Sequence, residues 1–301
     1  MATILQKATA HLSRLYPLYS GCGNFSNSWW FRKITKTATE SVWTEVLGGE
    51  VLANLNDYIG RSVYFCGAAD KKVSWVCQRI VQPGDTVIDI GANIGELTVL
   101  FSSLVGNKGE VHSFEPNPLL FGCLQQAQER NQMQNVQLYP VALGNDNTTM
   151  ELVIPKENMG SASLVRHKNR NHCEKITVNV CPLDTTLELT ENSTISLLKV
   201  DVEGFEETVL SGAHKLLSKK PPQVILFELN NRTSRNLNDE AIIKLLSKYD
   251  YSFVVIPKNI FHMKLNSINL NQTDHPQGHD FLAIHRGDNF AEICQRLKIS
   301  P

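Results

Sequence analysis

The stretch Thr86-Val-Ile-Asp-Ile-Gly-Ala-Asn-Ile-Gly-Glu-Leu-Thr-Val-Leu100 decides how this chain folds. An apolar strand runs into a turn that contains Gly91 and Gly95, and an apolar helix follows at once. A strand, a tight glycine turn and a helix N-terminus together form a binding site for a nucleotide-like ligand. Asp89 lies inside the apolar run, where an unpaired charge is costly. Because a phosphate site normally lacks a neighbouring acid, Asp89 favours a ligand with positive charge, such as an ammonium or sulfonium group.

Strands and helices alternate on both sides of this turn. We expect strands at 86–91, 110–115, 136–143, 195–201, 223–229, 252–256 and 280–285, with β-like runs at 150–155 and 175–181. We expect helices at 2–16, 72–80, 94–105, 118–131, 205–219 and 238–249, a loop at 20–28 and a strand at 62–66. This alternation predicts an α/β fold with a mostly parallel sheet and helices on both faces, in which the last two strands pair antiparallel.

Composition indicates an ordinary globular protein. The chain has 301 residues, 42% of them hydrophobic, and a net charge of −1, which gives no electrostatic reason to expect nucleic acid or an anionic membrane as partner. No apolar run approaches the roughly 20 residues of a membrane span. The scattered basic residues of 1–30 make a poor signal peptide. Seven cysteines without a CxxC pair favour reduced thiols in the cytoplasm.

Candidate ligand-binding residues lie where the predicted strands end, because open α/β sheets bind ligands at that edge. Glu115 lies 20 positions beyond Gly95, where dinucleotide-binding folds place the acid that binds ribose hydroxyls. The third strand ends in small apolar residues around Ala142, which suit the edge of an adenine. A Gly/Ser-rich loop that contains Ser161 is a candidate to close over the ligand.

The fourth strand carries an unusual set of charges. Lys199, Asp201 and Glu203 alternate along it and therefore project to one face. Glu228 ends the next strand, so Asp201 and Glu228 converge if the two strands are neighbours. Two close carboxylates can provide a general base or bind a divalent ion such as Mg²⁺, and Lys199 can instead neutralise one of them. His279, before the last strand, is a further candidate base.

Four segments together resemble the FkbM family of S-adenosylmethionine-dependent methyltransferases. They are Pro83–Gly95, Phe114–Asn117, Gly160–Ser163 and Leu198–Glu206, of which the last, with Lys-Val-Asp-Val-Glu-Gly-Phe-Glu, is the most specific. The resemblance implies a Rossmann-like class I methyltransferase with a seven-stranded sheet whose last strand is antiparallel. Family members often carry Gly-x-x-Glu before the helix at 72–80, whereas this chain reads Gly67-Ala-Ala-Asp70.

The resemblance also assigns roles to residues. The predicted S-adenosylmethionine contacts are Asp89, Gly91, Ala92, Asn93 and Gly95 for the methionine part, Glu115, Pro116 and Asn117 around the ribose, Ala142 and Ser161, and Asp201 and Glu203 near the transferred methyl. We predict Asp201 as the first candidate base, followed by Glu228 and His279, and Asp201 with Glu228 as ligands if a metal binds.

These residues predict methyl transfer to a hydroxyl or carboxyl group of a small molecule, such as a sugar or a natural product. Alternatives are N-methylation of a natural product or peptide, a nicotinamide-dependent oxidoreductase, and a cofactor-binding scaffold without activity. We expect an N-terminal extension at 1–80 that caps the substrate or contacts a second copy in a homodimer, a catalytic domain at 81–290 and a tail at 291–301.

Overall fold

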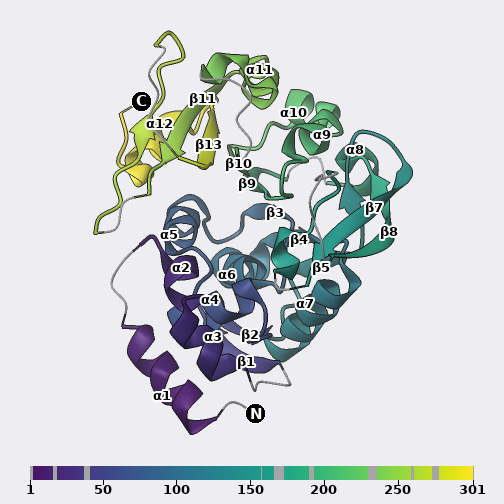
Figure 1. Cartoon of the computed structure of the whole chain (residues 1–301). Coiled ribbons are helices and arrows are strands. Elements are labelled where there is room, and N and C mark those ends of the chain that lie inside the picture. The colour runs from purple at the N-terminus through teal and green to yellow at the C-terminus, as the bar shows by residue number, and fades with distance from the viewer. Residues whose placement is uncertain are drawn as a thin grey trace.

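A computed structural model describes residues 3–15, 19–36, 41–156, 158–165, 173–189, 193–229, 236–258, 261–272 and 278–300. Its main sheet has the strand order β12-β11-β13-β10-β9-β3-β4-β5 (Figure 1). The strands are β3 (Thr86–Ile90), β4 (Glu110–Phe114), β5 (Val136–Tyr139), β9 (Ile195–Val200), β10 (Val224–Glu228), β11 (Tyr251–Ile256), β12 (Asn266–Ser267) and β13 (Asp280–His285).

The pairing within this sheet confirms the predicted topology. Strands β5, β4, β3, β9 and β10 pair in parallel, and β13 inserts between β10 and β11 antiparallel to both. Seven strands agree with the prediction, and the two-residue β12 adds an edge. The order of strands changes direction between β3 and β9, so the ends of these two strands border the crevice where α/β folds bind ligands.

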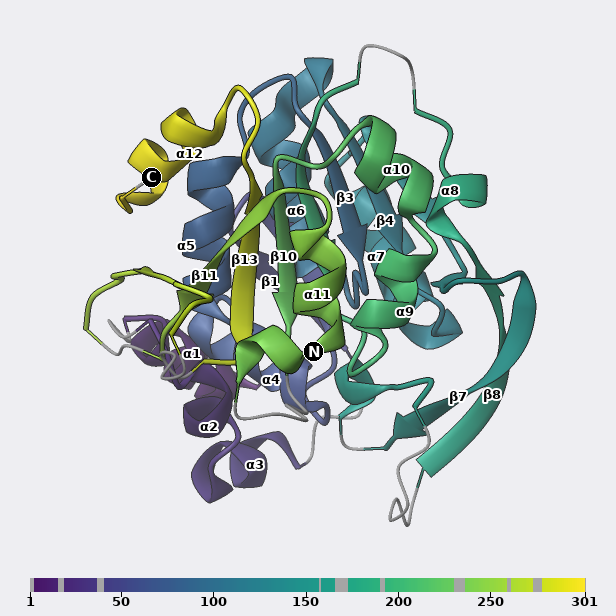
Figure 2. The ribbon, with the colours of Figure 1, turned by 90° about the horizontal axis from the view of Figure 1, so that it is seen from above.

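Helices cover both faces of the sheet. One face carries α5 (Lys71–Ile80), α6 (Glu96–Val105), α7 (Pro118–Arg130) and α12 (Phe290–Leu297), which share a buried apolar cluster with it. The other face carries α9 (Glu206–Ser211), α10 (His214–Lys219) and α11 (Ala241–Ser247), which lie together in Figure 2 and form a second cluster. The central strands β3, β9, β10 and β13 are therefore buried from both sides, which explains why most of their residues are apolar.

A small second sheet replaces the irregular stretch after β5. It consists of β6 (Ala142–Leu143), β8 (Cys173–Cys181) and β7 (Thr148–Pro155), in that order. The predicted strand at 136–143 is therefore divided, since Pro140 cannot donate a ladder hydrogen bond. The short helical turns are η1 (Gly106–Lys108), η2 (Met159–Ser161), α8 (Leu183–Thr186) and η3 (Leu237–Asp239).

The N-terminal region forms three helices, a hairpin and a fourth helix. These elements are α1 (Ile4–Ser13), α2 (Cys22–Ser26), α3 (Trp29–Thr35), β1 (Val42–Val46), β2 (Gly49–Ala53) and α4 (Tyr58–Cys66). The predicted strand at 62–66 is wrong, because the carboxylate of Asp57 caps α4 by accepting hydrogen bonds from the N–H groups of Ile59 and Gly60. The predicted loop at 20–28 contains the short helix α2.

Two other boundaries differ from the prediction. The helix expected at 205–219 is divided near Gly212, where a side chain would collide with the carbonyl oxygen of Gly144. The segment expected as a tail contains α12, whose Ile293 and Leu297 are buried against the main sheet's apolar cluster. Within the described residues, none of the helices is both long and apolar enough to span a bilayer.

Candidate functional site

The glycine turn after β3 brings two strand ends into close contact. Gly91 has φ of +78°, and a Cβ there would lie 1.9 Å from the carbonyl oxygen of Asp201. The N–H groups of Gly91 and Ala92 both donate to the carbonyl of Phe114, at 3.0 Å each. Only glycine fits position 91, because both its positive φ and the adjacent backbone exclude a side chain.

Glu115 is buried at the end of β4. Its two carboxylate oxygens accept hydrogen bonds from the N–H groups of Asn93, at 2.9 Å, and Asn117, at 2.8 Å. Burial raises the pKa of the Glu115 carboxyl to about 7, against the lowering effect of these two hydrogen bonds. Each oxygen retains a lone pair, so the carboxylate can also accept hydrogen bonds from a ligand.

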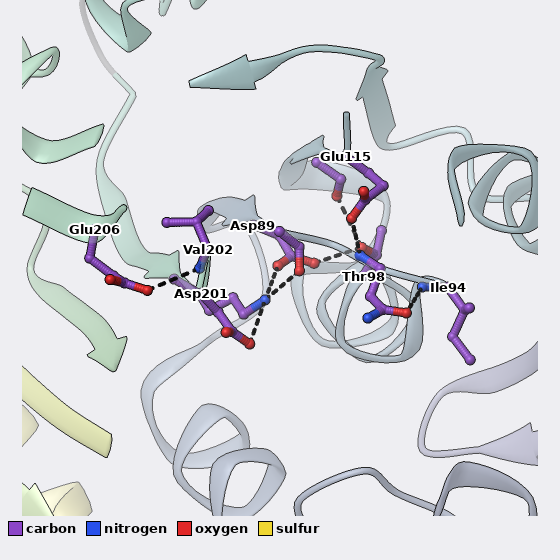
Figure 3. A network of polar contacts seen from close by, with 11 residues as sticks. Asp89, Ile94, Thr98, Glu115, Asp201, Val202 and Glu206 are labelled. Atoms are coloured by element: carbon purple, nitrogen blue, oxygen red, sulfur yellow. Dashed lines mark hydrogen bonds and ion pairs between the residues drawn. The ribbon is translucent and has the colours of Figure 1, made fainter. Parts of the chain in front are cut away.

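Lys199 neutralises the buried acid of the turn. Its Nζ lies 3.3 Å from Asp89, 3.5 Å from Asp201 and 2.7 Å from the carbonyl oxygen of Gly91 (Figure 3). Burial opposes the charge of Lys199, but Asp89 and then Asp201 outweigh it and raise the pKa of the ammonium. Thr98 donates a hydrogen bond of 2.7 Å to the second oxygen of Asp89. The positive partner that Asp89 requires is therefore within the chain.

Two cavities open at the carboxyl ends of these strands. The smaller one has an apolar wall that includes Phe114, Ala142 and Leu143, with Glu115 at its rim. The larger one, of about 850 Å³, is lined by the ends of β9 and β10 and by the N-terminal segment 19–25. The residues that line both cavities are Asn93, Gly160, Asp201 and Glu203. This junction joins a site suited to a flat base and ribose to a larger site.

The structure brings most of the predicted residues to these cavities. Those that line one or both are Gly91, Asn93, Glu115, Pro116, Ala142, Asp201, Glu203 and Glu228. Asp89, Ala92, Gly95 and Asn117 lie behind this surface and shape the turn and the helix ends. Ser161 does not line either cavity, although its neighbours Gly160 and Ala162 do.

His279, the third candidate base, does not line either cavity. Its carbonyl accepts a hydrogen bond of 2.8 Å from Leu229, and its side chain lines neither cavity, whereas that of Asp280 lines the larger one. Among the described residues no group of three or more His, Cys, Asp or Glu could hold a metal ion. Asp201 and Glu228 are therefore two candidate ligands without a third such side chain beside them among the described residues.

Sequence reasoning missed two groups that line the larger cavity. Glu96, the first residue of α6, accepts a hydrogen bond of 2.9 Å from the N–H of Ala69, and burial raises the pKa of its carboxyl to about 7. Lys72 pairs with Asp70, at 2.8 Å, and with Asp280. The motif Gly67-Ala-Ala-Asp70 pointed to this region. The shared contact of Asp70 and Asp280 with Lys72 could not be inferred, because the two acids lie far apart in the sequence.

A Rossmann-like sheet with one antiparallel strand, and a ligand site at its carboxyl edge, define a class I methyltransferase fold. The family model described as the methyltransferase FkbM domain matches residues 89–253. The chain belongs to this family and is an S-adenosylmethionine-dependent methyltransferase.

Two related proteins and one solved structure are similar to this chain. Methyltransferase 1 of Beauveria bassiana (strain ARSEF 2860) is 28% identical over 178 residues, which are 50% of this chain and 71% of that protein. The 31-O-demethyl-FK506 methyltransferase FkbM of Streptomyces tacrolimicus is 27% identical over 158 residues, 44% of this chain and 60% of its own length. Aeropyrum pernix fibrillarin, solved with natively bound S-adenosyl-L-methionine, is 14% identical with a TM-score of 0.38 and covers 68% of each chain. The chain thus spans less than two thirds of the Streptomyces relative.

Proposed function

We propose that this methyltransferase acts on a hydroxyl or carboxyl oxygen of a small molecule such as a sugar or natural product. The observation that carries the proposal is the position of Asp201 and Glu203 at the junction of a small apolar-walled cavity and a larger one. The residues fit the donor: Glu115 retains acceptor capacity for ribose hydroxyls, and the wall at Ala142 suits adenine. When bound, S-adenosylmethionine supplies an electrophilic methyl group on a positively charged sulfur.

The chain's own residues hold the acceptor and move its proton. The larger cavity positions the acceptor oxygen at the junction, where near-attack geometry requires about 3 Å between oxygen and methyl carbon. Asp201 accepts the proton of a hydroxyl acceptor, and Glu228, on the neighbouring strand, is the second candidate. The N-terminal segment 19–25 lines this cavity on the side of the acceptor. The 31-O-demethyl-FK506 activity in the Streptomyces relative's name supports an oxygen acceptor.

Incubation with methyl-labelled donor and a metabolite extract tests the proposed acceptor. We expect mass spectrometry to find the label on an oxygen atom of a small molecule, in a reaction at neutral pH. Label on a nitrogen atom would contradict O-methylation and support N-methylation instead. Donor binding without any labelled product in extracts would instead support a scaffold. Removal of divalent ions by EDTA, followed by their readdition, decides whether Asp201 and Glu228 act with Mg²⁺.

Free thiols at all seven cysteines support a reducing compartment such as the cytoplasm.

The proposed ribose contact predicts that donor affinity depends on pH through Glu115. The ionised carboxylate accepts hydrogen bonds that the acid form cannot, so with a pKa near 7 the affinity should rise about 10-fold from pH 6 to pH 8. Glu115→Gln should weaken binding at pH 8 by about 10- to 100-fold and remove this rise. Calorimetric titration with S-adenosylmethionine measures both effects. Glu110→Gln, at the exposed start of the same strand, serves as the control.

The same pKa sets the sign of a stability effect. Because burial raises the folded-state pKa of Glu115 above its ordinary value of 4.5, its contribution to stability is complete below pH 4.5 and is lost as pH rises through about 7. The unliganded wild type should therefore lose more stability than Glu115→Gln between pH 5 and pH 8 in urea unfolding. An equal loss in the two proteins would contradict the assignment of this pKa to Glu115.

A further inference from the structure

Helix α1 has its apolar residues on the outside. Ile4 at its start, Leu12 in its last turn and Leu15 just after it are 88%, 68% and 72% exposed. The polar residues Gln6 and Ser13 are instead 1% and 7% exposed and face the protein. At 100° per residue the exposed apolar residues fall on one side of the helix, opposite the buried polar ones. This arrangement is the reverse of a surface helix that packs only on its own core, and it points to a partner outside the chain.

Helix α3 carries further exposed apolar side chains. Trp29 and Trp30 begin the helix, are 71% and 47% exposed, and contact each other edge to face. Helices α1 and α3 are in contact, because the side-chain amide of Gln6 donates a hydrogen bond of 2.8 Å to the carbonyl of Ile34. Figures 1 and 2 both show α1, α2 and α3 together at one end of the molecule. We call this end, residues 3–15 and 19–36, the N-terminal face.

The charge of the N-terminal face identifies its partner. Residues 1–39 contain no Asp or Glu and five basic residues, so residues 40–301 carry a net charge of −6 although the whole chain carries −1. The near-neutral charge of the whole chain is therefore the sum of a basic N-terminal segment and an acidic remainder. Among the basic residues of this segment, Lys7, Lys33 and Lys36 are exposed. Exposed lysines, aliphatic side chains and indoles in one acid-free segment match the interface of an anionic membrane.

We propose that the N-terminal face docks the protein on the surface of an anionic lipid membrane. The apolar side of α1 enters the boundary between headgroups and acyl chains, and the lysines bind the lipid charge. A second copy of the chain fits less well, because a symmetric contact would bring two acid-free basic surfaces together. The link from α1 to α2 also lines the larger cavity at Tyr19, so docking brings that cavity to the lipid surface.

Co-sedimentation of the full chain with vesicles tests this proposal without any assay of methyl transfer. We expect binding to phosphatidylcholine vesicles that contain phosphatidylserine, and much weaker binding to phosphatidylcholine alone or at high salt. Each lysine near an anionic surface contributes about a five-fold gain in partitioning, so the triple variant K7E/K33E/K36E should bind on the order of 100-fold more weakly. The variant I4S/L12S/L15S should also lose binding.

Two control variants match these changes elsewhere on the surface. Leu119→Ser removes an apolar side chain of 60% exposure on α7, and Lys219→Glu reverses an exposed charge on α10. Both should bind vesicles like the wild type. Failure of the wild type to bind anionic vesicles, or equal binding by K7E/K33E/K36E, would overturn the proposal. So would a concentration-dependent dimer that I4S/L12S/L15S dissociates, because the apolar face would then be covered by a second copy.

Discussion

The Asp201→Asn variant is expected to lose about 10²- to 10⁴-fold in kcat, because general-base assistance to a hydroxyl acceptor has this size. Its affinity for S-adenosylmethionine should change little, since the side chain meets the donor only at the junction of the two cavities. Asparagine has nearly the same shape as aspartate, so it can still accept a hydrogen bond from Lys199, and the fold should persist. Initial rates of label transfer and calorimetric titration with the donor measure the two quantities.

Glu207→Gln provides the matched control for this prediction. Glu207 is an exposed acid in the first turn of α9 and lines neither cavity, so its loss should leave both kcat and donor affinity unchanged. Equal losses of kcat and of donor affinity in Asp201→Asn would mean that Asp201 binds the donor and does not act as the general base for the acceptor. Full activity of this variant would transfer the role of base to Glu228.

The Lys199→Met variant is expected to lose about 3–5 kcal/mol of stability, because it removes one partner of a buried ion pair. Asp89 is fully buried and would retain only the hydrogen bond from Thr98, and Gly91 would lose the donor to its carbonyl. Met keeps most of the volume of the lysine stem, so the loss reflects charge rather than a cavity. Urea unfolding at pH 7 measures it as a lower midpoint with an unchanged slope.

A second substitution separates the charge from other effects of Lys199→Met. Asp89→Asn in the same chain removes the unpaired carboxylate and should recover at least about 1 kcal/mol of the loss. Lys219→Met, an exposed lysine on α10, should change stability by less than about 0.5 kcal/mol. If Lys199→Met were as stable as Lys219→Met, Lys199 would not compensate the charge of Asp89.

The main sheet could be predicted because most of its strands are short apolar runs, and β3, β4, β9 and β10 each precede a helix. The N-terminal region could not be predicted in the same way. Helix α4 is buried on nearly every side, so residues 62–66 show no helical period, and the cap at Asp57 is the main local sign of its start. Helix α1 misleads in the opposite sense, because its apolar period is real but faces outward.

The residues that line the cavities were predicted where the strand ends impose them, at Gly91, Glu115 and Asp201. The partner of Asp89 was not, because Lys199 is 110 positions away and only the parallel pairing of β3 with β9 places the two side by side. Spacing along one strand placed Lys199 on the face of Asp201, and it could not show that the lysine also reaches the glycine turn. Contacts between distant segments require the three-dimensional structure.

A crystal structure with S-adenosylhomocysteine tests the central claim most directly. The account predicts that the ribose hydroxyls bind Glu115, that the adenine lies against Ala142, and that the sulfur lies at the junction near Asp201, facing the larger cavity. A ribose bound elsewhere, or a sulfur that faces away from the larger cavity, would contradict the assignment of that cavity to the methyl acceptor.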